Sequence, residues 1–215
     1  MRAVIRGFGE LLITLGVIIL LFCGYQVFWT SLQAKSAMNR ENSQLREQWE
    51  GGAGGLKAFS PGQGFAIIHI PRLGADYEKP ILEGTSLDIL DKGVGHYEET
   101  AMPGEVGNFS LAGHRLTHGE PFRHLDKLRK GDYVVIETAD FWYTYRITTN
   151  PYIVLPSDTE VIAPVPNRPG KKPTKAMITL TTCHPWYSSE KRMILHGVLV
   201  SKLKRSDGPP PALQS

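Results

Sequence analysis

The first thirty residues differ sharply from the rest of the chain in their hydrophobic pattern. The stretch LLITLGVIILLFCGYQVFW, residues 11–29, is nineteen residues long and carries no charge. At a helical rise of about 1.5 Å per residue, this length covers roughly the 30 Å hydrocarbon core of a bilayer. A cleaved signal sequence has a shorter apolar region and a small-residue cleavage site, and no clean site follows here. The pattern predicts an uncleaved transmembrane anchor within residues 1–30. Its interfacial aromatic flank would be Tyr25, Phe28 and Trp29.

Polarity rises abruptly after the anchor. Residues 31–61 are predicted to continue the helix as a polar stalk and then to form a linker, because GGAGG at 51–55 breaks a helix. One folded domain is expected over residues 62–205, followed by a disordered tail at 206–215, where proline and polar residues dominate. Large downstream domains translocate largely regardless of charge, so the simplest topology places this domain outside the cytoplasm.

Short runs with β-type alternation recur from about residue 62, with turn signals between them. Strands of this length at this spacing are typical of an all-β barrel or sandwich. Helical patterns are limited to short pieces near 86–91 and 121–128. The predicted strand runs are GFAIIHIP, ADYEKPILEG, GNFSLAGH, DYVVIET, FWYTYRITTNPYIVLP, KAMITLTTC and RMILHGVLVSKL.

Composition narrows the function classes only a little. The chain is 41% hydrophobic and 21% charged, as in an ordinary globular protein. A net charge of +3 without a basic stripe gives no support for a nucleic-acid partner. Of the two cysteines, Cys23 lies in the apolar segment and Cys183 lies far downstream. No disulfide is expected, and Cys183 is predicted to be a free thiol.

Cys183 stands at the point where a predicted strand ends. Threonine and isoleucine in MITLTTC favour a strand, and the following His-Pro ends the ladder because proline has no N–H to donate. Alternation places Thr179, Thr181 and Cys183 on one face of this strand. A lone cysteine is often an inert small hydrophobe, and it becomes a nucleophile only beside a base or a cation. The chemistry therefore depends on what lies next to the thiol.

Two side chains are candidates for activating this thiol. His114 closes the strand run NFSLAGH, and Arg192 begins the run RMILHGV after the loop HPWYSSEK. If these strand ends meet at one rim of a barrel, a thiol, an imidazole and a guanidinium come together, as acyl transfer requires. The residues alone leave unrelated structural roles open. His69 and His196 lie inside strand runs and are interpreted as side chains of the sheet.

A zinc site is a competing interpretation of the same region. His114 and His118 have the spacing H-x-x-x-H, but they lie in a glycine-containing loop instead of on a helix. Cys183 and His184 are adjacent in sequence and would be strained as a ligand pair. Calcium needs several clustered carboxylates. The only dense acidic group nearby is formed by Glu98, Glu99 and Glu105, which is insufficient for such a site. Neither a metal nor another cofactor is expected.

The sequence TLTTC at 179–183, with an arginine nine residues later and AGHR upstream, closely resembles the sortase family of cysteine transpeptidases. The similarity runs from about residue 62 to residue 204. The fuller strings are most similar to class E, the housekeeping type of high-GC Gram-positive bacteria. These strings are GHY, PGEVGNFSLAGHR, GEPF, TTCHPWYSSEKR and HG. The resemblance implies a mainly β fold, an eight-stranded barrel of mixed parallel and antiparallel strands with short helices, preceded by one N-terminal transmembrane helix.

The resemblance also implies roles for individual residues. Cys183 would attack the threonine carbonyl of a C-terminal sorting signal, His114 would protonate the leaving glycine amine, and Arg192 would hold the substrate oxygen. The thioester would then pass to an amine of a cell-wall precursor. Class E sortases are similar in preferring L-A-x-T-G over L-P-x-T-G, which is associated with a tyrosine such as Tyr97. Thr182 is expected to line the substrate groove.

The implied partners are surface proteins that carry an LAXTG-like signal, a peptidoglycan precursor amine, and the lipid bilayer through residues 11–29. The basic loop NRPGKKPTK at 167–175 would border the groove by the same resemblance, although a solvated loop explains its composition equally well. Two alternatives stay open. One is a catalytically silent, membrane-tethered binding domain on the same barrel. The other is a wall enzyme of the L,D-transpeptidase type, whose S-x-G-C context is absent here.

Overall fold

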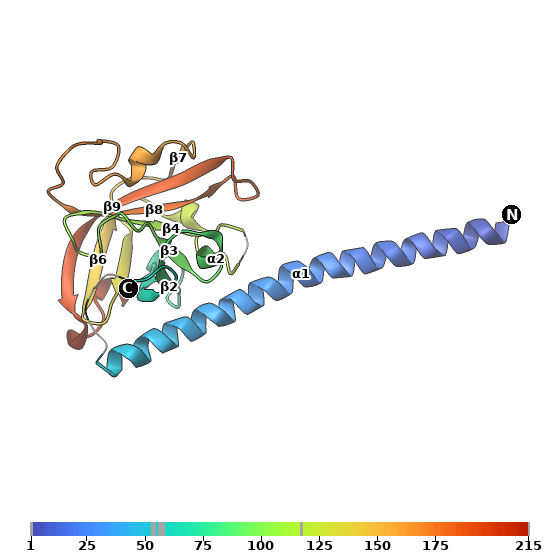
Figure 1. Cartoon of the computed structure of the whole chain (residues 1–215), viewed down its shortest axis with the longest axis horizontal. Helices are drawn as coiled ribbons and strands as arrows, with labels where there is room; N and C mark the ends of the chain where they lie inside the picture. Colours follow the sequence, from blue (N-terminus) through green and yellow to red (C-terminus); the bar gives the residue numbers. More distant parts are fainter. Residues whose placement is uncertain (1, 53–54, 56–58, 117, 215) are drawn as a thin grey trace.

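One continuous helix, α1 (Arg2–Glu50), links the N-terminus to a β domain in the computed structural model, which describes residues 2–52, 55, 59–116 and 118–214 (Figure 1). Over Ile5–Tyr25 the helix is long and apolar enough to cross a membrane, and this stretch is not buried by the domain. The expected window, residues 11–29, overlaps this span. Of the expected aromatic flank, Tyr25 is exposed, and the side chains of Phe28 and Trp29 lie outside the described part of the chain.

The helix ends where glycine was expected to break it. The N–H of Gly51 still donates to the carbonyl of Glu47 at 3.0 Å, and Gly52 adopts a φ of 87°, which an L-residue rarely does. The polar residues 31–50 therefore continue the apolar helix without interruption, as predicted.

The β domain is a closed barrel. Its strands hydrogen-bond in the order β6-β5-β1-β2-β3-β4-β8-β9, and a β6–β9 pairing closes the ring of eight. β7 adds a ninth, short strand beside β9. The β2–β3 and β4–β8 pairs are parallel and the others are antiparallel, which confirms the expected eight-stranded mixed barrel. The strands are β1 (Gly64–His69), β2 (Glu78–Glu83), β3 (Val94–His96), β4 (Gly107–Ala112), β5 (Tyr133–Glu137), β6 (Phe141–Ile147), β7 (Tyr152–Val154), β8 (Ala176–His184) and β9 (Lys191–Lys204).

Short helical pieces connect the strands. β3 was not among the predicted strands, because three residues give no readable alternation. α2 (Leu87–Leu90) and the 3₁₀ turn η2 (Leu125–Lys127) fall in the two segments where short helices were expected. The remaining 3₁₀ turns are η1 (Pro71–Leu73), η3 (Thr159–Ile162), η4 (Arg205–Asp207) and η5 (Pro211–Leu213).

The core fills the inside of the barrel with aliphatic and aromatic side chains. β4 is buried along its whole length, with Phe109 and Leu111 fully enclosed. Strands that run parallel to a neighbour are commonly buried on both faces. Ile178 and Leu180 of β8 belong to the same core, and this fixes β8 beside β4. The rigid β4–β8 pair is the scaffold for the site described below.

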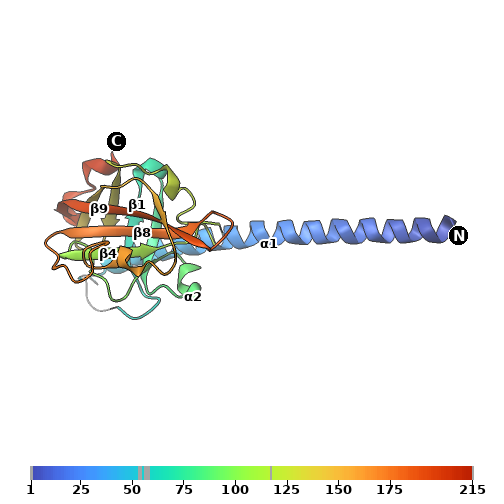
Figure 2. The ribbon, with the colours of Figure 1, turned by 90° about the horizontal axis from the view of Figure 1, so that it is seen from above.

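The second half of α1 packs along the barrel, while the first half projects away from it (Figures 1 and 2). Met38, Asn42 and Leu45 are buried at helical spacings of four and three residues, so they form one stripe on the helix. This half of α1 contacts β1 and β2. The predicted stalk is therefore a docked element, which its polar composition had concealed.

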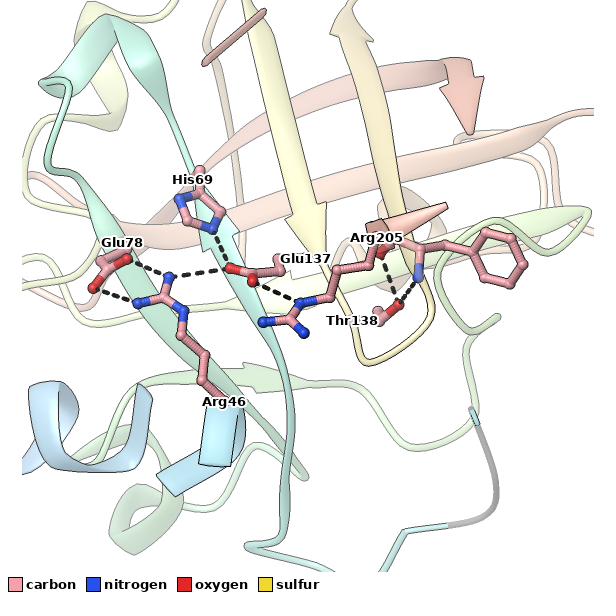
Figure 3. Close-up of polar contacts among 7 residues, drawn as sticks. Arg46, His69, Glu78, Glu137, Thr138 and Arg205 are labelled. Atoms are coloured by element: carbon pink, nitrogen blue, oxygen red, sulfur yellow. Dashed lines mark hydrogen bonds and ion pairs between the residues drawn. The ribbon is translucent and has the colours of Figure 1, made fainter. Parts of the chain in front are cut away.

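Charged side chains fasten the end of α1 to the barrel (Figure 3). Arg46 makes two hydrogen bonds to Glu78, at 2.6 and 3.3 Å, and one to Glu137 at 3.1 Å. Glu137 is buried and also contacts His69 at 3.0 Å and Arg205 at 3.2 Å. Burial alone would raise the pKa of Glu137, but hydrogen bonds from His69 and Arg46 hold that pKa below its ordinary value.

The C-terminal residues depart from the expected disordered tail. They form the two turns η4 and η5, and Pro210 between them is buried. The second turn contacts β5. Proline loses little conformational entropy on ordering, because its φ is already fixed, so a proline triplet can pack at a small cost.

Candidate active site

Cys183 and Arg192 are direct cross-strand neighbours. β8 and β9 form an antiparallel hairpin in which Cys183 is paired with Arg192, one position inside the loop-facing end. Side chains directly opposite in such a pair lie on the same face, with Cβ atoms roughly 4.5–5.5 Å apart. The loop HPWYSSEK thus returns the arginine to the cysteine, as the sequence predicted.

His114 follows the strand on the other side of β8. In the parallel β4–β8 pair, Ala112 is level with Thr181. The N–H of Gly113 donates to the carbonyl of Thr181 at 3.2 Å, so the register continues beyond the end of β4. Extended by two residues, this register would bring His114 level with Cys183. Three adjacent strand ends thus carry a row of three candidate groups, an imidazole, a thiol and a guanidinium.

Gly113 makes this arrangement possible. A Cβ atom at this position would lie 2.7 Å from the ring of Phe122, closer than real contacts allow. The carbonyl of His114 accepts a hydrogen bond from the N–H of Phe122 at 2.9 Å, which draws the following loop back against the strand end. A side chain larger than hydrogen at 113 would displace His114 from the row.

The imidazole of His114 is half-buried and hydrogen-bonded. Its Nε2 lies 3.1 Å from Oδ1 of Asp91, the residue that ends α2. Burial lowers the pKa of His114, and this outweighs the opposing effect of the Asp91 carboxylate. Its surroundings therefore favour the neutral ring. Because Nε2 is engaged, Nδ1 is the nitrogen left for proton transfer.

Arg192 is held by its own loop. Its Nη1 donates to the carbonyls of Ser189 at 2.7 Å and Lys191 at 3.0 Å. A guanidinium has five N–H donors in a planar fork. The donors on Nε and Nη2 are thus free of these two bonds and suit an oxygen that gains negative charge near Cys183.

Arg115 links the segment that carries His114 to the strand that carries Cys183. This arginine is buried, and its Nη1 donates to Nδ1 of His184 at 2.9 Å, while its Nη2 pairs with Asp126 at 3.2 Å. These contacts tie the loop after β4 to the end of β8. The pKa of His184 is lowered by burial and by the positive charge of Arg115. His184 directly follows Cys183 in β8, so alternation places its side chain on the opposite face from the thiol.

The two threonines before the cysteine have different partners. Thr182 was expected to line the groove, but its side chain is buried and its hydroxyl donates to the carbonyl of Gly113 at 2.8 Å. It joins β8 to the end of β4. Thr181 shares a face with Cys183, and its hydroxyl donates to the carbonyl of Leu111 at 3.1 Å and lies 3.2 Å from the hydroxyl of Tyr97. Tyr97 is therefore on the cysteine's face of β8.

Other residues singled out from the sequence lie elsewhere. His69 and His196 are buried in the sheet, as expected. Burial lowers the pKa of His196 to about 4, so it is neutral. The basic loop at 167–175 is largely solvent-exposed.

Sequence reasoning missed Asp91 and Arg115. Asp91 lies 23 residues before its partner His114, after a four-residue helix, and nothing in its local pattern signals the contact. Arg115 was visible as the last letter of AGHR, but alternation in an extended chain would point it away from the thiol.

Known proteins share this architecture. The sortase-domain family model matches residues 68–200. Sortase SrtE1 of Streptomyces coelicolor is 46% identical over 98% of this chain, and the chain spans 61% of that relative's length. A crystal structure of Sortase E1 from the same species, with a tripeptide in the active site, is 48% identical, covers 73% of this chain and 99% of its own, and has a TM-score of 0.66. The structure of sortase E from Streptomyces avermitilis is 46% identical and covers 72% of this chain and 99% of its own, again at 0.66. The chain belongs to the sortase family of cysteine transpeptidases, with class E sortases among its relatives.

Proposed function

We propose that this chain is a membrane-anchored transpeptidase whose catalytic domain lies outside the cytoplasm. It cleaves an LAXTG-like sorting signal between threonine and glycine and joins the shortened protein to an amine of a cell-wall precursor. The observation that supports this most directly is the row of His114, Cys183 and Arg192 across the ends of β4, β8 and β9. Family membership supports the reaction class.

The first half of the reaction forms a thioester. The neutral imidazole of His114 takes the thiol proton as the sulfur of Cys183 attacks the threonine carbonyl carbon. The free N–H groups of Arg192 stabilise the negative charge on the carbonyl oxygen. The threonine–glycine C–N bond then breaks, and His114 returns its proton to the leaving glycine amine.

The second half transfers the acyl group. An amine of the wall precursor attacks the thioester carbonyl, and His114 accepts the proton that the amine loses. The C–S bond breaks, and the Cys183 sulfur leaves and regains its proton from His114. One peptide bond is broken and one is formed, so no oxidant, reductant or metal is consumed.

Tyr97 is the proposed reader of the second signal position. The single hydroxyl proton of Thr181 is donated to Leu111, so Tyr97 donates to Thr181 and its own oxygen remains free to accept. Alanine at the second position of the signal has a backbone N–H that proline lacks. A hydrogen bond from this N–H to Tyr97 favours L-A-x-T-G over L-P-x-T-G.

The experiment uses the full chain in detergent with L-A-x-T-G and L-P-x-T-G peptides, with and without a small amine acceptor. Mass spectrometry follows the acyl-enzyme adduct and the transpeptidation product, and Cys183→Ala serves as the control. We expect an adduct that depends on Cys183 and a product that depends on the acceptor. Peptide binding without any adduct would contradict the proposal and support the silent binding domain.

A further inference from the structure

Asp91, His114 and His118 form a cluster that the proposed transpeptidation does not explain. Among the residues that the structure describes, it is the one group of three or more His, Cys, Asp or Glu side chains with converging donor atoms. These donor atoms all lie within 4.8 Å of one another. Asp91 comes from the end of α2, His114 from the end of β4 and His118 from the loop that follows. Two segments, the end of α2 and the stretch that follows β4, thus converge on one point.

The distances within the cluster suit a tetrahedral ion. Oδ1 of Asp91 lies 3.1 Å from Nε2 of His114 and 3.2 Å from Nδ1 of His118. A tetrahedral ion with bonds of about 2.0–2.2 Å keeps neighbouring ligand atoms about 3.3–3.6 Å apart. The two rings lie 5.3 Å apart and are tilted by 37°, so they do not stack flat against each other. The donor atoms of the two histidines lie within 4.8 Å of each other, so the rings need only approach each other for all three atoms to reach one ion.

The donor types select the class of ion. Two imidazoles and one carboxylate suit zinc and neighbouring transition metals, whereas magnesium and calcium prefer oxygen ligands alone. Three protein ligands with an open fourth position are common in zinc sites that are not purely structural. In the sequence, His114 and His118 were weighed together with Cys183 and His184 and no metal was expected; Asp91 was not among the residues considered.

An ion can reach the cluster from solvent. Asp91 and His118 line a cavity of about 600 Å³ whose other wall is α1, including Leu32, Ala37 and Arg40. The side chains of Asp91 and His118 are each about 40% exposed, so neither needs to be uncovered. The positive charge of Arg40 opposes a cation here, which favours a reversible site over a permanent structural one.

We propose that Asp91, His114 and His118 bind a divalent transition-metal ion of the zinc type, and that its binding inhibits the enzyme reversibly. This rests on the proposed role of His114 as the proton carrier. A metal bound at Nε2 leaves the neutral ring with its hydrogen on Nδ1, so Nδ1 can no longer take the thiol proton and both half-reactions lose their proton carrier. The chain would then respond to metal through the residue that it needs for catalysis.

The binding test is independent of activity. The full-length Cys183→Ala protein in detergent is titrated with ZnCl₂, and bound metal is measured by elemental analysis after dialysis and by competition with a colorimetric chelator. We expect one zinc per chain. His118→Asn in the same background should weaken binding at least about tenfold, since one of three ligands is lost. Asparagine tolerates the positive φ of 54° at this position, so the loop keeps its shape. The exposed His124 is the matched control, and His124→Asn should bind zinc as before.

The inhibition test uses the protein with its cysteine intact. Zinc should inhibit peptide cleavage, a chelator should restore it, and the half-inhibitory concentration should rise at least about tenfold in His118→Asn but not in His124→Asn, each relative to its own zinc-free rate. Zinc binding that vanishes in Cys183→Ala but persists in His118→Asn would place the ion on the thiol and overturn the proposal, as would no binding at all. If no peptide is cleaved, the proposed function fails, while the titration of Cys183→Ala still decides whether the metal site exists.

Discussion

Two carboxylates in different parts of the domain, Glu137 and Asp91, each contact more than one basic side chain. They differ in burial and in the kind of partner. Glu137, where α1 ends against the barrel, is buried and contacts His69, Arg46 and Arg205. Asp91, at the rim near Cys183, is about 40% exposed and contacts only histidines among the ion pairs described. Both carboxylates contact histidine, but of the two only Glu137 also forms described ion pairs with arginine, whose charge is permanent.

This difference suggests that the carboxylate at the α1 junction stabilises the fold, whereas the carboxylate at the rim takes part in the chemistry. An arginine keeps its charge at any pH in this range, so Glu137 stays ionised and the α1 junction has one stable protonation state. In the ion pairs described for Asp91 the partners are imidazoles, and a neutral imidazole, unlike a guanidinium, can accept a proton. Changes at the junction should therefore affect stability and spare chemistry, whereas changes at the rim should do the opposite.

The largest effect is expected at the rim from Cys183→Ala. It should abolish peptide cleavage and acyl-enzyme formation, because the nucleophile is lost, and leave the melting temperature almost unchanged. Mass spectrometry of the adduct and thermal unfolding measure the two properties. Cys23→Ala is the matched control and should keep full activity, since Cys23 lies in the exposed apolar helix. Any residual adduct in Cys183→Ala would refute the assigned nucleophile.

His114→Ala should reduce kcat/KM by roughly 10²–10⁴-fold, the usual contribution of a positioned general acid–base group. Added imidazole should restore part of the rate, which a purely structural defect would not allow. His184→Asn is the control and should cost far less, because His184 is bonded to Arg115. Equal losses in the two variants would remove the distinction between these histidines.

The same substitution made in both regions gives a direct test of the comparison. Arg192→Lys keeps the charge but loses the planar fork, and should lower kcat/KM by about tenfold or more with little change in melting temperature. Arg46→Lys loses the two-point contact with Glu78 and should cost about 1–2 kcal/mol of stability, after allowance for its partial exposure. Its kcat/KM should stay near wild type. The comparison fails if Arg192→Lys mainly lowers stability, or if Arg46→Lys mainly lowers kcat/KM.

Acid should weaken the junction through Glu137. The folded pKa of Glu137 lies below its ordinary value of 4.5, so its contribution to stability is complete above that pH and disappears as the pH falls through the folded pKa. Glu137→Gln should be less stable at neutral pH and should lose less further stability on acidification. Denaturant unfolding at a series of pH values measures both. The exposed Glu99→Gln should follow wild type at every pH, and identical pH slopes for Glu137→Gln and wild type would contradict this assignment.

The smallest effect is expected from Tyr97→Phe. Losing one hydrogen bond to the alanine N–H should shrink the preference for L-A-x-T-G over L-P-x-T-G by about two- to twelve-fold, and cleavage at Cys183 should continue. The measurement is the ratio of kcat/KM for the two peptides in each protein. An unchanged ratio would mean that Tyr97 only packs beside Thr181 and that other residues build any preference.

The strands of the barrel could be predicted because alternation is local. The same holds for Cys183 at a strand end, since the His-Pro pair that follows it is visible in the sequence. The row with His114 depends on the parallel register of β4 and β8, which pairs Ala112 with Thr181 almost seventy residues away, and no local pattern encodes that pairing. Family resemblance, not periodicity, singled out the three residues together.

Asp91 and the docked face of α1 escaped prediction for the same reason: both depend on contacts between distant parts of the chain. Asp91 reaches His114 only because α2 folds against the rim, and the docked face of α1 hides a narrow stripe of three buried residues among polar neighbours. Asn42 within that stripe is even polar, and its side-chain atoms make no hydrogen bond among the described residues. A polar residue in a helix normally indicates a solvent-exposed position, so the polar half of α1 was interpreted as a stalk that does not contact the domain.

Because α1 is uninterrupted, its length fixes the distance between the apolar span and the rim of the barrel. Gly119, in the loop after His114, packs against Ala34 and Met38, which lie nine and thirteen residues beyond Tyr25. At about 1.5 Å per residue, the rim is held about 14–20 Å along the helix from the end of the apolar span. If that span crosses the bilayer as proposed, a substrate anchored in the same membrane needs roughly four to six extended residues between its own apolar segment and the scissile bond to reach Cys183. The length of α1 would then select sorting signals by spacing as well as by sequence.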